Sequence, residues 1–437
     1  MRSSAQSPVG VITEPGSALP RSLLLAYSLS PAVAKLMGAD WLFGVGLLLL
    51  AAYFSVCKPA TFMGDSTSRR HLMPRLPLTL FVIYGVGLGI ALCVMRVADV
   101  RAATVGAFNF LVPLLIVSVA GPDRAARMLY DLPFVAVAHA VLALLMYAPL
   151  RPPIELIESL SETLLTGTAA FRLSSVSGSL ALSSVMVAAF AVAVRRLVTV
   201  SNSGTGTWRT WVAAALFLIC GFLSLQRAAW LSLAAILLAG LIAAAPNRRI
   251  AVMSLLAVLI APIFAALLLM DIPEDAVDIF KDRFATLTGG SETSAVGERS
   301  GQWLNVFQNF WTLPIGHGPG QLGQPVRDFG PVTGGLPIFD GDYFRIVSEY
   351  GPVGVALVLI LVAGAWRALK IAIQALARRR QRADLVIAAA VLGLLLQCVG
   401  TNVTELYFAN AVFWSFWLQV WTARKPVFAA TNTAPNC

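Results

Sequence analysis

The sequence predicts an all-α polytopic membrane protein with about twelve transmembrane helices. Of its 437 residues, 58% are hydrophobic and only 12% are charged, too little charge to cover a soluble protein of this length. The apolar residues also form long blocks rather than the narrow stripes of a soluble amphipathic helix. Because backbone groups in lipid must be hydrogen-bonded internally, and the blocks are too long and uniform for barrel strands, each block is expected to be a helix.

The expected spans can be placed in order along the chain. The first is the weakest, because it contains Pro31 and Lys35. Residues 211–245 would form one helix of about 52 Å, longer than the ~30 Å hydrocarbon core, so two spans joined by a turn near 224–227 are expected. The expected spans are 22–38, 41–57, 76–95, 102–120, 132–150, 178–198, 210–225, 228–245, 250–270, 343–365, 384–401 and 404–422.

The net charge of +10 does not indicate a nucleic-acid partner. Most of the 32 basic residues lie in short loops on one side of the predicted spans, as expected for cytoplasmic anchors. This asymmetry predicts that both termini are cytoplasmic. The five cysteines are scattered and have no spacing typical of a metal site or a disulfide framework.

The chain reads as a single transmembrane domain, residues 1–437, with one large outer loop. Residues 271–342, between spans nine and ten, hold nearly half of the 22 acidic residues. Aromatic side chains recur through this segment, including Trp303, Phe307 and Trp311. A loop of this length that contains aromatic residues is expected to be functional and to pack as a cap on the membrane domain.

Three arginines are expected on the outer face. Arg227 interrupts the apolar run 211–245, Arg172 precedes the sixth span, and Arg299 lies in the outer loop. Each alone could be an interfacial arginine whose charged head reaches water. Together they suggest an anion site, because the planar guanidinium pairs in a bidentate manner with phosphate oxygens.

Acidic residues cluster where the outer loop enters the tenth span. Asp340, Asp342 and Glu349 surround Arg345, and on a helix Arg345 and Glu349 share one face. Asp342 could instead cap that helix, and Glu349 could form a purely structural salt bridge. A carboxylate two turns into an apolar span is nevertheless expensive, which favours a functional site.

The glycine-rich segment 313–324 could form a nest of backbone N–H groups for an anion, or it could be a plain turn-rich loop. His317 within it is a candidate acid or base, although a lone loop histidine is usually incidental. No GxxxxGK[ST] motif is present, so the chain is not expected to use ATP.

The order of four motifs resembles the bacterial O-antigen polymerase/O-antigen ligase family. The motifs are "FRLSSVSGS" at 171–179, "SLQRAAWLSL" at 224–233, "GERSGQW…PIGHGPGQLG" at 297–323 and "DGDYFRIVSEYGPVG" at 340–354. The resemblance covers roughly residues 170–365, and it implies a multi-pass protein of the bacterial inner membrane. It also implies glycosyl transfer at the periplasmic face from a glycan carried on undecaprenyl pyrophosphate.

The resemblance implies roles for individual residues. Arg172, Arg227 and Arg299 match arginines of the family and would bind the pyrophosphate, and Arg345 is a fourth candidate. In ligases of the family a histidine stands nine residues before the glutamate; here that position is Asp340. This departure favours a polymerase, with Asp340 as the catalytic base and Asp342 or Glu349 as alternatives.

Other functions stay open at this point. The chain could be a ligase that passes finished glycan to a lipid or protein acceptor. It could also be a lipid-linked oligosaccharide flippase, although flippases usually carry charges near the membrane midplane. The resemblance implies no cofactor, and no ligand spacing compels a metal. Expected partners are the undecaprenyl-pyrophosphate-linked oligosaccharide, the bilayer, and other polysaccharide assembly proteins such as a flippase and a chain-length regulator.

Overall fold

The computed structural model describes most of the predicted membrane domain. The described residues are 18–39, 41–60, 75–147, 154–155, 157, 172–175, 178–199, 204–246, 248–257, 304, 308, 315–323, 341–377 and 382–422. Most of the predicted outer loop, with Arg299 and Asp340, lies outside them, as do residues 258–270 of the predicted ninth span. The described residues are helical apart from short connections and one isolated bridge between Ser175 and Gly178.

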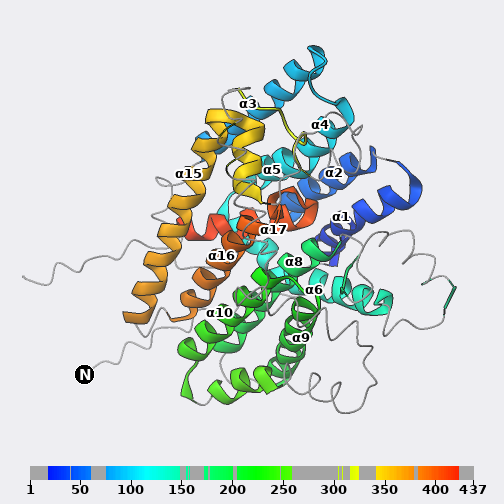
Figure 1. Cartoon of the computed structure of the whole chain (residues 1–437). Coiled ribbons are helices and arrows are strands. Elements are labelled where there is room, and N and C mark those ends of the chain that lie inside the picture. The colour runs from blue at the N-terminus through cyan, green and yellow to red at the C-terminus, as the bar shows by residue number, and fades with distance from the viewer. Residues whose placement is uncertain are drawn as a thin grey trace, which may run out of the picture.

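By their order along the chain the helices form two groups, and Figure 1 shows α17 between α1–α5 on one side and α8–α10 on the other. The first group lies before residue 150 and comprises α1 Ala18–Met37, α2 Trp41–Val56, α3 Arg75–Val94, α4 Val100–Gly106, the π-helical turn η1 Ala107–Leu111, α5 Val112–Ala120 and α6 Pro122–Met146. The second group comprises α8 Ser179–Thr199, α9 Gly204–Leu223, α10 Arg227–Ala243, α15 Asp342–Ala377, α16 Arg382–Gly400, the 3₁₀ turn η3 Val403–Glu405 and α17 Tyr407–Thr422. Helix α17 contacts both groups.

The membrane prediction is confirmed in its main point. Among the described residues, six helices are long and apolar enough to cross a membrane: α3, the run Val100–Ala120, α6, α8, α15 and α16. The same part of the chain has three shorter apolar helices: Trp41–Val56, Trp208–Leu223 and Arg227–Ala243. The chain is therefore a multi-pass membrane protein whose described part is an all-helical bundle. The count of about twelve spans, and the position of the outer loop between spans nine and ten, stay predictions.

Two helices extend beyond their predicted spans. Helix α6 begins at Pro122 rather than near residue 132, because Gly121 adopts a φ of 81° and Pro122 suits the first helical turn. The charges that made this stretch look like a loop are accommodated in the helix, where Asp131 pairs with Arg127 at 3.1 Å. Helix α15 continues to Ala377 rather than ending at residue 365.

A proline interrupts the regular bonding of the run Val100–Ala120. Pro113 has no N–H to donate to the Asn109 carbonyl four residues earlier, and the chain forms a π-helical turn just before it. The side chain of Asn410 on α17 donates to the freed Asn109 carbonyl at 2.7 Å and to that of Phe110 at 3.0 Å. The π turn thus joins the two groups of helices.

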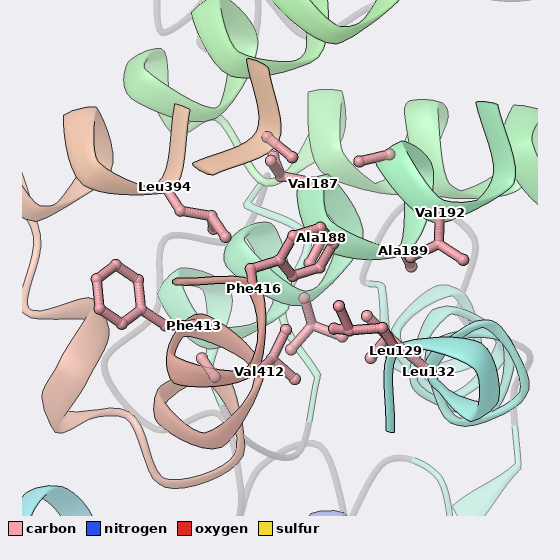
Figure 2. Close-up of a cluster of buried hydrophobic side chains, with 14 of the residues drawn as sticks. Leu129, Leu132, Val187, Ala188, Ala189, Val192, Leu394, Val412, Phe413 and Phe416 are labelled. Atoms are coloured by element: carbon pink, nitrogen blue, oxygen red, sulfur yellow. The ribbon is translucent and has the colours of Figure 1, made fainter. Parts of the chain in front are cut away.

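Helix α8 is the centre of the bundle. It is buried on nearly all faces and contacts α6, α9, α10, α16 and α17. Its small alanine, serine and valine side chains let neighbouring backbones approach closely. Figure 2 shows Val187, Ala188, Ala189 and Val192 of this helix packed against side chains of α6, α16 and α17, which include Leu132, Leu394 and Phe416.

Side-chain contacts show which helix ends lie together at each end of the bundle. At one end, Arg196 near the end of α8 donates to the Tyr130 carbonyl at 2.6 Å. There too, Gln419 near the end of α17 donates to the Pro122 carbonyl at 3.0 Å. The starts of α8 and α17 therefore lie at the opposite end, together with the segments that precede these helices. This opposite end holds the candidate site.

Candidate functional site

The first turns of α15 present three charged side chains on one face. Asp342, Arg345 and Glu349 follow one another at helical spacing, and each is at most 1% exposed. The Arg345 guanidinium donates to Asp342 Oδ1 at 3.0 Å and to Glu349 Oε2 at 2.7 Å. The predicted contact between Arg345 and Glu349 is therefore present. Asp342 is the first residue of α15, and its oxygens also bind a second segment of the chain.

That second segment is the connector between α16 and α17. The Thr404 backbone N–H donates to Asp342 Oδ2 at 2.9 Å, and its hydroxyl donates to Asp342 Oδ1. The Thr404 hydroxyl oxygen also accepts a hydrogen bond from Arg345 at 2.9 Å. One residue of the connector thus binds both members of an ion pair on α15 and fixes the start of that helix against α16 and α17.

The connector adds a third carboxylate, which the sequence analysis missed. Glu405 is 1% exposed, and its Oε2 lies 3.9 Å from Arg345 Nε and accepts from the Asn402 amide at 3.1 Å. A signal existed in the sequence, because Glu405 stands in a short polar stretch, residues 401–405, between two apolar blocks. We call Asp342, Arg345, Glu349 and Glu405 the acid cluster.

Aromatic packing completes the surroundings of Arg345. Its guanidinium carbon lies 4.8 Å from the centre of the Phe110 ring, at a distance that favours a cation–π interaction. Phe110 belongs to the π-helical turn that Pro113 induces, and its ring also packs against Tyr350 at 5.7 Å. The first group of helices therefore closes one side of the acid cluster.

The glycine-rich segment lies over the acid cluster. Leu322 N–H donates to Glu349 Oε1 at 3.3 Å, and a Cβ added at Gly323 would overlap the Glu405 carboxylate. His317 N–H and Gly318 N–H donate to the carbonyls of Ser348 and Glu349 at 3.0 and 2.9 Å. The sequence suggested that these amides could form a nest for a free anion. In the structure they donate to acceptors on α15 instead.

His317 faces partly into this packed region. Desolvation lowers the pKa of its imidazole below the ordinary value, so the side chain is neutral at pH 7. A neutral imidazole can accept a proton, which keeps His317 as a candidate base.

Arg172 and Arg227, two of the arginines predicted to bind an anion, lie at the turn between α9 and α10. This turn spans residues 224–226, as predicted, and Arg227 is the first residue of α10. Arg172 Nε donates to the Ser224 carbonyl at 3.0 Å, and the neighbouring Leu173 N–H donates to the Leu223 carbonyl at 3.0 Å. Both arginines are half-buried. We call residues 223–227 together with Arg172 the arginine turn.

The arginine turn and the acid cluster occupy the same end of the bundle. Gln226, next to Arg227, donates from Nε2 to the hydroxyl of Thr401, and Thr401 begins the connector that carries Glu405. The structure therefore brings five of the predicted residues to one end: Arg172, Arg227, Asp342, Arg345 and Glu349. Arg299 and Asp340 lie outside the described residues, although the neighbouring Gly341 N–H donates to Asn402 Oδ1 at 2.9 Å.

Among the described residues, no group of three or more His, Cys, Asp or Glu side chains could hold a metal ion. The acid cluster has three carboxylates, but the Arg345 guanidinium occupies the position between them. Charge compensation in the described part of this site thus comes from an arginine.

The comparison with protein families gives a match over part of the chain that carries most of the candidate site residues. Residues 212–359 match a family model described as O-antigen ligase. The match runs from within α9 to within α15, and it includes Arg227, Arg299, Asp340, Arg345 and Glu349. A search of curated proteins found no match.

Proposed function

We propose that this chain belongs to the O-antigen ligase/polymerase family, whose model matches residues 212–359, and that it is a polysaccharide polymerase of the bacterial inner membrane. It would transfer a growing glycan from undecaprenyl pyrophosphate to the free end of another lipid-linked repeat unit. The reaction would take place at the periplasmic face, with both termini of the chain in the cytoplasm. The polysaccharide would be an O-antigen, a capsule or an exopolysaccharide.

One observation carries the proposal: Arg172 donates to the backbone of the turn that leads into Arg227, and this turn lies at the same end of the bundle as the acid cluster. In this reaction a sugar hydroxyl attacks the anomeric carbon of the donor, and the bond from that carbon to the pyrophosphate oxygen breaks. Negative charge grows on the leaving pyrophosphate. Fixed guanidinium groups there favour the transition state over the ground state.

We assign the pyrophosphate to Arg172, Arg227 and Arg299. Arg345 receives a different role from the one suggested by the sequence, because it is 1% exposed and its guanidinium already donates to Asp342, Glu349 and Thr404. In this proposal Arg345 is a positioning residue that holds the start of α15 against the connector.

The proton of the attacking hydroxyl needs an acceptor, and we assign Asp340 to this task. Asp340 precedes Gly341, whose N–H is held by Asn402 of the connector. Asp342 and Glu349, the alternative bases, are engaged in salt bridges to Arg345. We therefore propose that these two acids support the reacting segment and that Asp340 takes the proton.

A ligase is the second candidate, and the description of the matching family model favours it. It would use the same arginines and transfer finished glycan to a lipid or protein acceptor. The two functions differ in what accumulates when the protein is deleted: loss of a polymerase leaves single repeat units, and loss of a ligase leaves full-length chains on the lipid carrier.

The experiment replaces Arg227 by Ala, and separately Asp340 by Asn, in the native host. Arg209→Ala, at an exposed arginine near the other end of α9, is the matched control. We expect both site variants to lose long polysaccharide while membrane levels of the protein stay normal, and the control to keep it. Wild-type polysaccharide in both site variants would overturn the assignment.

A further inference from the structure

A buried glutamine joins the arginine turn to the acid cluster. Gln226 is 6% exposed and stands immediately before Arg227. Its Oε1 accepts from the Ser183 hydroxyl on α8, and its Nε2 donates to the Thr401 hydroxyl after α16. We propose that Gln226 is a positioning residue that fixes Arg227 relative to the connector, and this inference rests on the proposed function of Arg227.

The backbone at this turn needs such an anchor. Leu225, a non-glycine residue, has a φ of 55°, in the left-handed region that side chains of L-residues disfavour. Strained backbone of this kind persists only where surrounding contacts over-determine it, and it concentrates at functional sites. The contacts here are the Arg172 hydrogen bond to the Ser224 carbonyl on one side and the two Gln226 side-chain bonds on the other.

Thr401, which accepts the hydrogen bond from Gln226, is directly connected to residues that contact the acid cluster. Thr401 is directly followed by Asn402, which accepts from Gly341 N–H at 2.9 Å and donates to Glu405 at 3.1 Å. The path from Arg227 to Glu405 of the acid cluster therefore consists of two peptide bonds and two hydrogen bonds: Arg227 adjoins Gln226, Gln226 donates to Thr401, Thr401 adjoins Asn402, and Asn402 donates to Glu405. A shift of the Gln226 side chain would move the arginine and the acids relative to each other.

The chain offers a matched control for a purely structural role. Gln397 on α16 is fully buried between the same helices, accepting from Ser184 at 2.9 Å and donating to Ser232 at 3.4 Å. Its hydrogen bonds resemble those of Gln226, but Gln397 adjoins no residue of the arginine turn in the sequence. Replacing either glutamine by leucine removes the same two kinds of bond in the same packing environment.

The experiment measures two quantities on purified full-length protein in detergent or nanodiscs. The first is the thermal unfolding midpoint. The second is kcat/KM with undecaprenyl-pyrophosphate-linked repeat unit extracted from a host that lacks this protein. We expect Gln226→Leu and Gln397→Leu to lower the midpoint by similar amounts, but only Gln226→Leu to lower kcat/KM, by on the order of tenfold or more.

A second pair of variants tests the partner. Thr401→Val keeps the shape but removes the hydroxyl, and it should lower kcat/KM in the same direction as Gln226→Leu. Thr401→Ser keeps the hydroxyl and should retain activity. Equal kcat/KM values for Gln226→Leu and Gln397→Leu, or for the valine and serine variants, would overturn the proposal.

Arg227→Ala separates this inference from the proposed function. If Arg227→Ala abolishes activity while Gln226→Leu behaves like Gln397→Leu, the positioning role fails and the pyrophosphate site stands. If Arg227→Ala is fully active, the proposed function of Arg227 fails, and the positioning role fails with it.

Discussion

The Ser348 carbonyl of α15 accepts the backbone N–H of His317 at 3.0 Å. In an unbroken helix that carbonyl would accept from residue 352, but residue 352 is a proline and has no N–H. Gly351 adds a break, with φ 56° and ψ −137°, and the Glu349 carbonyl accepts from Gly318 instead. The glycine-rich segment is therefore bound where α15 is broken, and the break also places Glu349 beneath that segment.

The first prediction concerns Gly351. Its backbone angles lie in a region that is almost restricted to glycine, so Gly351→Ala should destabilise the protein by about 1–3 kcal/mol and loosen the 315–323 segment. The measurement is thermal unfolding in detergent, together with proteolysis of that segment.

Gly87→Ala is the control for this change. A Cβ added at Gly87 meets nothing within 4 Å, and the residue lies inside α3. Alanine is the better helix former there, so this variant should match or slightly exceed the wild-type unfolding midpoint. Equal midpoints for the two alanine variants would contradict the role of the break.

The second prediction concerns Arg345. Lysine keeps the charge, but its single ammonium group cannot bind Asp342, Glu349 and Thr404 in the geometry of the guanidinium fork. A single ammonium cannot pair with both carboxylates, so one of them is left buried without its partner. Arg345→Lys should therefore lower the free energy of unfolding by about 3–5 kcal/mol. Arg209→Lys, at an exposed site on α9, should leave the unfolding midpoint unchanged. A wild-type midpoint for Arg345→Lys would rule out a structural role for these salt bridges.

Some features of this site were predictable because they depend on local spacing. Arg345 and Glu349 are four residues apart on an apolar helix, so their 2.7 Å contact follows from helical geometry alone. The turn before Arg227 followed from length, since the apolar run is too long for one span. Neither inference required knowledge of the neighbouring helices.

Other contacts depend on tertiary packing and cannot be derived from local spacing alone. Glu405 stands 60 residues after Arg345, and only the packing of α16 and α17 against α15 brings the two together. The glycine-rich segment has no periodicity that could identify the broken part of α15 as its partner. Asp131 stands just before the predicted span 132–150, and only the packing of α1 and α2 against α6 brings Arg21 and Tyr53 to its carboxylate.

The third prediction concerns pH. Burial lowers the pKa of His317, so below about pH 6.5 the unfolded chain binds more protons at this residue than the folded protein does. The corresponding stability is present above that pH and is lost as pH falls through the folded-state pKa. When the pH is lowered from 7.5 to 5.0, the unfolding midpoint of the wild type should therefore fall further than that of His317→Gln. Parallel losses in the two proteins would show that another group controls the acid response.

The fourth prediction separates stability from activity. Asp131 of α6 is 1% exposed and accepts from Tyr53 of α2 at 3.1 Å, as well as from Arg127 and Arg21. Because Asp131→Asn weakens a buried pair that joins three helices, it should cost about 3 kcal/mol; Arg21, which is 42% exposed, contributes little of this. Tyr53→Phe removes one hydrogen bond and should cost about 1 kcal/mol.

These two changes should leave kcat/KM per folded molecule at the wild-type value. Tyr130, the neighbour of Asp131, binds Arg196 near the end of α8, whereas the arginine turn is held by Ser183 near its start. Unfolding midpoint and kcat/KM, measured on the same samples, give the two quantities independently. The contrary result would be that Asp131→Asn lowers kcat/KM as strongly as Arg227→Ala while most of the protein stays folded. In that case the reaction depends on both ends of the bundle, and its assignment to the arginine turn and the acid cluster alone is wrong.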